Sequence, residues 1–182
     1  ICSFALQAQV KVAAIFSDNM VLQRHSKIPV WGCANANEKV TVQFNNQTKT
    51  TKADQTGKWI VRLDDEMAGG PYVLKIKGKN SIEIKNILVG EVWICSGQSN
   101  MEWTVGQADE AENEIDMANF PQIRHVKIPK EINSFPASDI EKTAWEVCSP
   151  KTVANFTAIG YYYAKELNNK LNIPIGIINA SW

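Results

Sequence analysis

The stretch VGEVWICSGQSNMEWT, residues 89–104, joins an apolar run to a cluster of small and amide residues. The apolar residues 92–95 predict a strand covered on both faces, as strands are in an α/β sheet. Residues 96–100 interrupt the run, and residues compatible with a helix follow. Ligands and catalytic groups of open α/β sheets lie outside the carboxyl ends of the strands. The stretch therefore predicts a polar turn at the edge of such a sheet where sites are built.

Upstream of this stretch, residues 10–88 have the pattern of short strands and turns. Residues 39–44 and 58–63 alternate polar and apolar side chains, which is the period of a half-buried strand. Residues 54–57 supply turn chemistry, and Gly57 is free to adopt positive φ. Six or seven such strands without a helical period predict an antiparallel β-sandwich domain over residues 10–88.

Downstream, residues 89–182 alternate strands and helices. Strands are predicted at residues 92–95, 123–128 and 175–178, and helices at residues 109–119 and 155–171. Phe156, Ile159, Tyr163 and Leu167 recur at helical spacing and predict the buried face of the last helix. The pattern indicates a parallel sheet flanked by helices. The fold class is therefore α/β, with a sandwich followed by a second domain, residues 89–182, that is incomplete as given.

Composition limits the classes of partner. Hydrophobic residues make up 45% and charged residues 21% of the chain, which are values of a globular protein. Lysine and arginine together number 19, as do aspartate and glutamate. This balance gives no electrostatic reason to expect nucleic acid or an anionic membrane as partner. No run approaches 18 apolar residues, so no bilayer span is expected.

Residues 1–8, ICSFALQA, resemble the end of a secretory signal peptide, with cleavage expected before Gln9. A short apolar strand and a lipid anchor on Cys2 are the alternatives. The signal interpretation predicts a secreted or periplasmic protein.

Beyond these residues, Cys33, Cys95 and Cys148 lack CxxC spacing, which makes a zinc site improbable. Cys95 is expected to pack as a small hydrophobe. One disulfide is compatible with export, and the pairing stays open.

Ser99 is the candidate nucleophile of the polar turn. A serine that enters a helix projects its hydroxyl from the sheet edge, and its own N–H is one of the unpaired donors of the helix start. Gly97 permits a tight bend before it. The structural alternative is that Ser, Gly, Gln and Asn are simply good turn and N-cap residues.

The flanking residues decide between these interpretations. The string GEVWICSGQSNME, residues 90–102, resembles the nucleophile block of the sialate O-acetylesterase family, a carbohydrate-esterase branch of the GDSL/SGNH hydrolases. Other stretches are similar to the same family in the same order along the chain: FSDNMVLQ at 16–23, PVWG at 29–32, AGGPY at 68–72 and PIGII at 174–178.

The resemblance implies that Ser99 attacks an acetyl ester on a sugar and forms an acetyl-enzyme that water hydrolyses. Its N–H would supply one oxyanion donor. Gln98 and Asn100 belong to the matching motif and would shape the turn or touch substrate. Glu102 and Trp103 are candidate sugar contacts, although packing is equally expected of Trp103. This route needs neither cofactor nor metal.

The chain departs from the family pattern in its general base. The family takes its histidine from a D-x-x-H-like block far downstream, and further oxyanion donors from a glycine after the Ser-Trp at 181–182 and from a later asparagine. His25 falls in a polar turn and is expected to be exposed, while His125, inside a strand, is expected to have a structural or surface role. The chain alone is therefore expected to be inactive and to need the rest of the hydrolase domain.

Three functions compete at this stage. The leading one is a secreted esterase that removes O-acetyl groups from sialic acid or related sugars. An acetyl xylan esterase would use the same motif, and a non-catalytic glycan-binding or interdomain sandwich is the alternative from another class. A downstream D-x-x-H would favour an enzyme.

Overall fold

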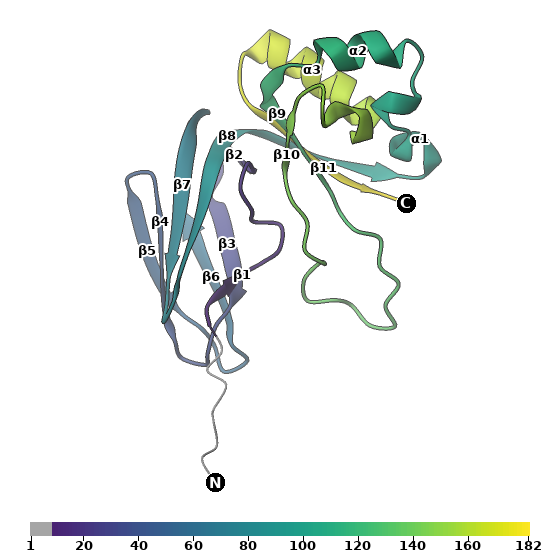
Figure 1. The fold of residues 1–182 in the computed structure, drawn as a ribbon. Coiled ribbons are helices and arrows are strands. Elements are labelled where there is room, and N and C mark those ends of the chain that lie inside the picture. Colours follow the sequence, from purple (N-terminus) through teal and green to yellow (C-terminus); the bar gives the residue numbers. More distant parts are fainter. Residues whose placement is uncertain (1–8) are drawn as a thin grey trace.

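The computed structural model describes residues 9–182, and the predicted signal segment 1–8 lies outside the described residues. Strands fill one half of the molecule, and the helices gather at the end of the other half (Figure 1). No helix within residues 9–182 is long and apolar enough to cross a bilayer. In chain order the elements are β1 (Lys11–Val12), β2 (Val21–Gln23), β3 (Ile28–Cys33), β4 (Lys39–Phe44), β5 (Gln47–Lys52), β6 (Lys58–Leu63), β7 (Gly69–Lys77), β8 (Ser81–Gly97), α1 (Ser99–Glu102), η1 (Val105–Gln107), α2 (Ala111–Met117), β9 (Phe120–Lys127), β10 (Glu146–Cys148), η2 (Val153–Asn155), α3 (Ala158–Leu171) and β11 (Ile175–Ser181).

The first half contains a three-stranded sheet, ordered β1-β3-β6, and the strands β5, β4, β7 and the start of β8. In β4 and β6 buried and exposed side chains alternate as predicted, and Val42 and Val61 belong to one core with Leu74 of β7. Gly57 takes the predicted positive φ, 81°. One pairing departs from the expected antiparallel pattern, because β2 runs parallel to β8.

Strand β8 joins the two halves. The sequence predicted a separate strand at residues 92–95, after a sandwich domain ending at residue 88, but the structure has one strand of 17 residues that spans this boundary. Its first part pairs with β7, and its last part, residues 91–97, pairs with β11. A Cβ at Gly90 would overlap the carbonyl oxygen of Pro174, so only glycine lets β11 approach at this point. No turn residue other than Gly90 separates the two apolar runs, and the strand continues through it.

The second half is built on three parallel strands. β11 lies between β8 and β9 and runs parallel to both, and β10 adds an antiparallel edge to β9. Helix α3 covers one face of this sheet through Tyr161 and Ala164, both fully buried. The predicted α/β alternation is therefore present. The helix begins at Ala158, because residues 153–155 form the short helix η2 instead.

The predicted buried face of α3 was partly wrong. Ile159 and Tyr163 are 51% and 44% exposed, whereas Gly160 is buried against the sheet. A Cβ at Gly160 would lie 2.9 Å from Sγ of Cys95, so the helix approaches β8 closely through its small residues. Close approach of a small-residue face displaces the larger apolar side chains to the flanks of the helix.

The carboxyl end of β8 is more open than its apolar sequence predicted. Cys95 is buried beneath α3, but Ile94 on the opposite face is 70% exposed. Within residues 9–182, β11 is the only strand that pairs with residues 91–97 of β8. Trp93 is held edge-on against Tyr163, with ring centroids 5.1 Å apart. One face and the outer edge of this segment are therefore uncovered.

His125 is buried in the middle of β9, with 1% of its surface exposed. Its ring stacks on Phe156 with centroids 4.4 Å apart, and neither ring nitrogen has a hydrogen-bond partner among the described residues. Burial, with a smaller contribution from the charge of Lys127, lowers the pKa of His125 to about 4. The folded protein therefore holds this imidazole neutral.

Replacing His125 with Phe should flatten the pH dependence of stability. An unfolded histidine titrates near pH 6.5 and the folded one near pH 4, so the unfolded state binds more protons between these values and stability falls as the pH drops. The wild-type chain should lose about 2 kcal/mol through this group between pH 7 and pH 5.

Urea denaturation at both pH values measures this loss. Ile123→Val, a buried substitution in the same strand that removes no titrating group, is the matched control and should lose as much stability between the two pH values as wild type. If His125→Phe lost as much stability between pH 7 and pH 5 as wild type, the loss would not come from the lowered pKa of His125.

Candidate active site

The Ser99 turn, defined as residues 96–102, links the end of β8 to α1. Gly97 ends the strand with φ 139°, a conformation that side chains rarely adopt. A Cβ there would meet only the Cβ of Met101, at 3.7 Å, so the backbone angle rather than crowding requires glycine. Gln98 follows in an extended conformation, and the helix starts at Ser99. A strand therefore leads into the serine and a helix leaves it, as the sequence predicted.

Hydrogen bonds close the turn behind the serine. The N–H of Met101 donates to the carbonyl of Gln98 at 2.9 Å, and that of Trp103 donates to the carbonyl of Ser99 at 3.1 Å. The N–H groups of Ser99 and Asn100 belong to the first helical turn and have no acceptor within the helix. Residues 98–100 are all exposed, so Ser99 lies at the surface of the described structure.

The turn is anchored on both sides. The N–H of Trp182, just after β11, donates to the carbonyl of Gly97 at 2.8 Å. The fully buried Thr157 donates its hydroxyl to the carbonyl of Met101 at 2.6 Å. The next N–H, that of Ala158, donates to the carbonyl of Trp103 at 2.8 Å. β11 and the start of α3 thus fix the position of the serine.

Glu102 and Trp103 have different surroundings. Glu102 forms an ion pair with Lys130, which follows β9. The ammonium group of Lys130 lies 5.8 Å from the centre of the Trp182 ring. Trp103 is 52% exposed and lines none of the described pockets. Its predicted contact with sugar stays a prediction.

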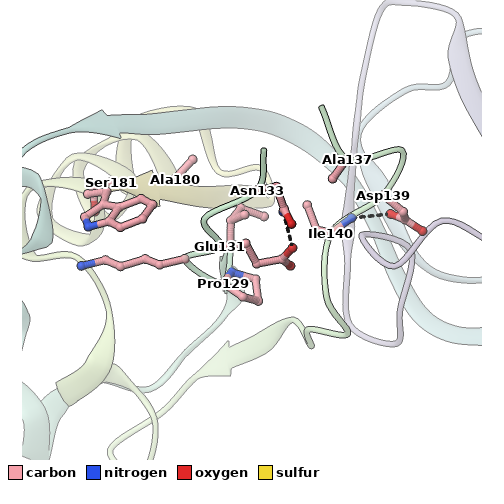
Figure 2. Close-up of a pocket in the computed structure, with 11 residues that line it drawn as sticks. Pro129, Glu131, Asn133, Ala137, Asp139, Ile140, Ala180 and Ser181 are labelled. Atoms are coloured by element: carbon pink, nitrogen blue, oxygen red, sulfur yellow. Dashed lines mark hydrogen bonds between the residues drawn. The ribbon is translucent and has the colours of Figure 1, made fainter. Parts of the chain in front are cut away.

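A pocket of about 350 Å³ lies beside this turn, at the carboxyl ends of β9 and β11. Ala180 and Ser181 form one end of it, Asp139 and Ile140 the other, and Glu131 and Asn133 lie between them (Figure 2). Ser181 pairs in register with Gly97, so the pocket begins one strand away from the Ser99 turn.

Sequence reasoning missed the two residues that connect this pocket to the turn, Lys130 and Trp182. Both follow the carboxyl ends of parallel strands, as the Ser99 turn does. Their position after the ends of predicted strands could have identified them as candidate site residues from the sequence.

The described histidines do not serve Ser99 as base. His25 is exposed in the loop after β2, as predicted, and His125 is buried and neutral in β9. Among the described residues the ring nitrogens of His125 have no hydrogen-bond partner, so Ser99 is not bonded to this ring. That a histidine outside residues 9–182 acts as the base for Ser99 stays a prediction.

The cysteine thiols offer no alternative nucleophile at this edge. Burial raises the pKa of Cys95, and raises that of Cys148 to about 11. Cys33 is exposed on β3, and all three are free in the described structure. Within the same residues, no three His, Cys, Asp or Glu side chains gather closely enough to hold a metal ion.

Three known proteins to which this chain is similar are named as acetylesterases of sugars. The sialate O-acetylesterase of Rattus norvegicus is 28% identical over 194 residues, which cover 94% of this chain and 35% of that protein. The human sialate O-acetylesterase is 26% identical over 195 residues, covering 94% and 37%. A carbohydrate acetylesterase from Xanthomonas citri superposes with a TM-score of 0.92 and 39% identity over 95% of this chain and 40% of that one. No family profile matches the chain.

These similarities relate the chain to the carboxylic ester hydrolases, and its mixed α/β fold is that of a carbohydrate acetylesterase. More particularly, the predicted resemblance to the sialate O-acetylesterase family is confirmed along nearly the whole chain. The chain spans about a third of the length of the curated relatives that it matches.

Removing the hydroxyl of Thr157 should loosen the Ser99 turn. Thr157→Val keeps the side chain's shape but leaves the carbonyl of Met101 without this donor, which should cost about 1–2 kcal/mol of unfolding free energy. Equilibrium urea denaturation measures the change. Thr157→Ser keeps the donor and should retain most of the stability. Equal stabilities for the Val and wild-type proteins would show that this bond does not hold the turn.

Proposed function

We propose that the protein is a serine carbohydrate esterase that removes O-acetyl groups from sugars through an acetyl-Ser99 intermediate. The single observation that carries this proposal is the exposed Ser99 at the carboxyl end of β8, on the turn that enters α1. The named activities of the relatives, sialate O-acetylesterase and carbohydrate acetylesterase, support the substrate class.

The proposed chemistry has two steps. Oγ of Ser99 attacks the acetyl carbonyl carbon as a base takes the hydroxyl proton, and the sugar leaves as an alcohol that receives a proton from that base. Water then attacks the acetyl group on Ser99, releases acetate and restores the hydroxyl. The carbonyl oxygen becomes negative in each step, and the N–H groups of Ser99 and Asn100 are the local donors that could stabilise it. Gln98 shapes the approach to this position.

A base must come from outside the described residues. We propose that it is a histidine of a downstream D-x-x-H-like block, and that further oxyanion donors also follow residue 182. In this proposal residues 10–88 are a β-sandwich domain, and residues 89–182 begin an SGNH-type domain that the rest of the protein completes. The open edge and face of β8 around Ile94 support this view, because they offer a place for more of the sheet domain.

Two further parts of the proposal rest on the sequence. Export to the periplasm or the cell exterior is proposed from the pattern of residues 1–8. Residues 9–182 alone are expected to have negligible esterase activity, because a serine hydroxyl without a base is a weak nucleophile.

Replacing Ser99 with Ala in the full-length protein should lower kcat for acetate release by at least about 10³-fold, because the attacking oxygen is lost. The substrates are an activated aryl acetate and an O-acetylated sugar. Ser96→Ala is the matched control, since this exposed serine ends the same strand and its hydroxyl reaches only the carbonyl of Ala180, at 3.4 Å.

The control should keep most of the activity. Full activity in Ser99→Ala would reject Ser99 as nucleophile. Absence of Ser99-dependent release from any ester would favour the non-catalytic glycan-binding module.

A further inference from the structure

Lys130 connects the end of β9 to the Ser99 turn. Its ammonium group forms an ion pair with the carboxylate of Glu102, the residue that ends α1. The same ammonium group lies 5.8 Å from the centre of the Trp182 ring. Within residues 9–182 no other ion pair involves a residue of the Ser99 turn. Lys130 is therefore the one cation that is paired with this turn in the described structure.

Both ends of the turn are tied to this lysine. At the carboxyl end the tie is the ion pair with Glu102. At the amino end it passes through Trp182, whose N–H donates to the carbonyl of Gly97 at 2.8 Å and whose ring lies beneath the ammonium group. This contact is possible because β8 and β11 pair in parallel and end side by side (Figure 1). Ser99 therefore lies on a turn that is held at its start and at its end.

The side chains in the ion pair are partly shielded from water. The exposed fraction is 37% for the Lys130 side chain and 29% for that of Glu102. Ion pairs with this much exposure add little to the free energy of unfolding. A nucleophile, in contrast, loses large factors in rate when it is misplaced by about 1 Å. Loss of Lys130 should therefore change the rate of acetyl transfer more than it changes stability.

We propose that Lys130 is a positioning residue for Ser99. It holds Glu102 and Trp182, and through them it fixes both ends of the Ser99 turn while the hydroxyl attacks the ester. The inference rests on the proposed esterase function and adds to it a residue from outside the serine motif. It also assigns Glu102 to the support of the nucleophile rather than to contact with the sugar.

Rapid-quench kinetics of the full-length protein with an activated aryl acetate test this role, because they measure the rate at which Ser99 is acetylated. This ester carries no sugar, so a change in rate cannot come from a lost contact with sugar. Lys130→Met keeps the length of the side chain but removes its charge, and should slow acetylation about tenfold with an unchanged urea midpoint. Lys130→Arg keeps a cation for Glu102 and Trp182 and should recover most of the rate.

A double-mutant cycle checks that the effect passes through the ion pair. Glu102→Gln should slow acetylation about threefold, because the contact between Lys130 and Trp182 remains. Independent effects would multiply to about thirtyfold in the double variant, whereas a shared ion pair predicts only the roughly tenfold loss of Lys130→Met. Lys127→Met is the matched control, since this exposed lysine of β9 forms no ion pair among the described residues, and it should keep the wild-type rate.

The outcomes separate the inference from the function on which it rests. If wild type shows no Ser99-dependent acetylation, both are overturned. If acetylation depends on Ser99 but Lys130→Met keeps the wild-type rate, or loses rate only with an O-acetylated sugar, the positioning role alone is overturned. A slow Lys130→Met protein with a lowered urea midpoint, whose rate Lys130→Arg does not restore, would show a general structural role and would overturn it as well.

Discussion

The close contact at Gly90 is the constraint on which the rest of the structure depends. β8 crosses there from the strands of the first half to the parallel sheet of the second, and any larger residue would overlap Pro174 at the start of β11. The ion pair between Arg24 and Glu91, 2.7 Å long, holds the next residue of β8 to the loop after β2. Because β8 is one strand, the position of its carboxyl end is set by both halves.

Everything proposed about Ser99 follows from that position. The strand ends at Gly97, whose φ only glycine adopts readily, and the serine is exposed on the next turn. Trp182 and Thr157 tie the turn to β11 and α3. A nucleophile must be held accurately relative to its substrate, since small misplacements cost large factors in rate. The buried, neutral His125 lies in β9 of the same sheet and belongs to this support and not to the chemistry.

The sequence predicted the local patterns well and the contacts between distant segments poorly. Alternation in β4 and β6, the turn at Gly57 and the strand-turn-helix around Ser99 depend on neighbouring residues, and all are present. The continuity of β8 and the buried face of α3 depend on close approaches of other segments to Gly90 and Gly160. The spacing of apolar residues along the sequence does not reveal such contacts. Lys130 reaches the site only because β9 ends at the same edge as β8, and strand order cannot be read from spacing. The predicted roles of Gln98 and Asn100 stay predictions.

The most direct test of the central claim is to trap the acyl-enzyme. Full-length protein is mixed with an activated acetyl ester, quenched in acid within the first turnovers and digested, and the peptide containing residues 98–102 is analysed by mass spectrometry. The account predicts one added acetyl group on Ser99, which disappears when the quench is delayed until the ester is consumed. Acetate release at full rate with no acetyl group on Ser99, or with the group on another residue, would contradict it.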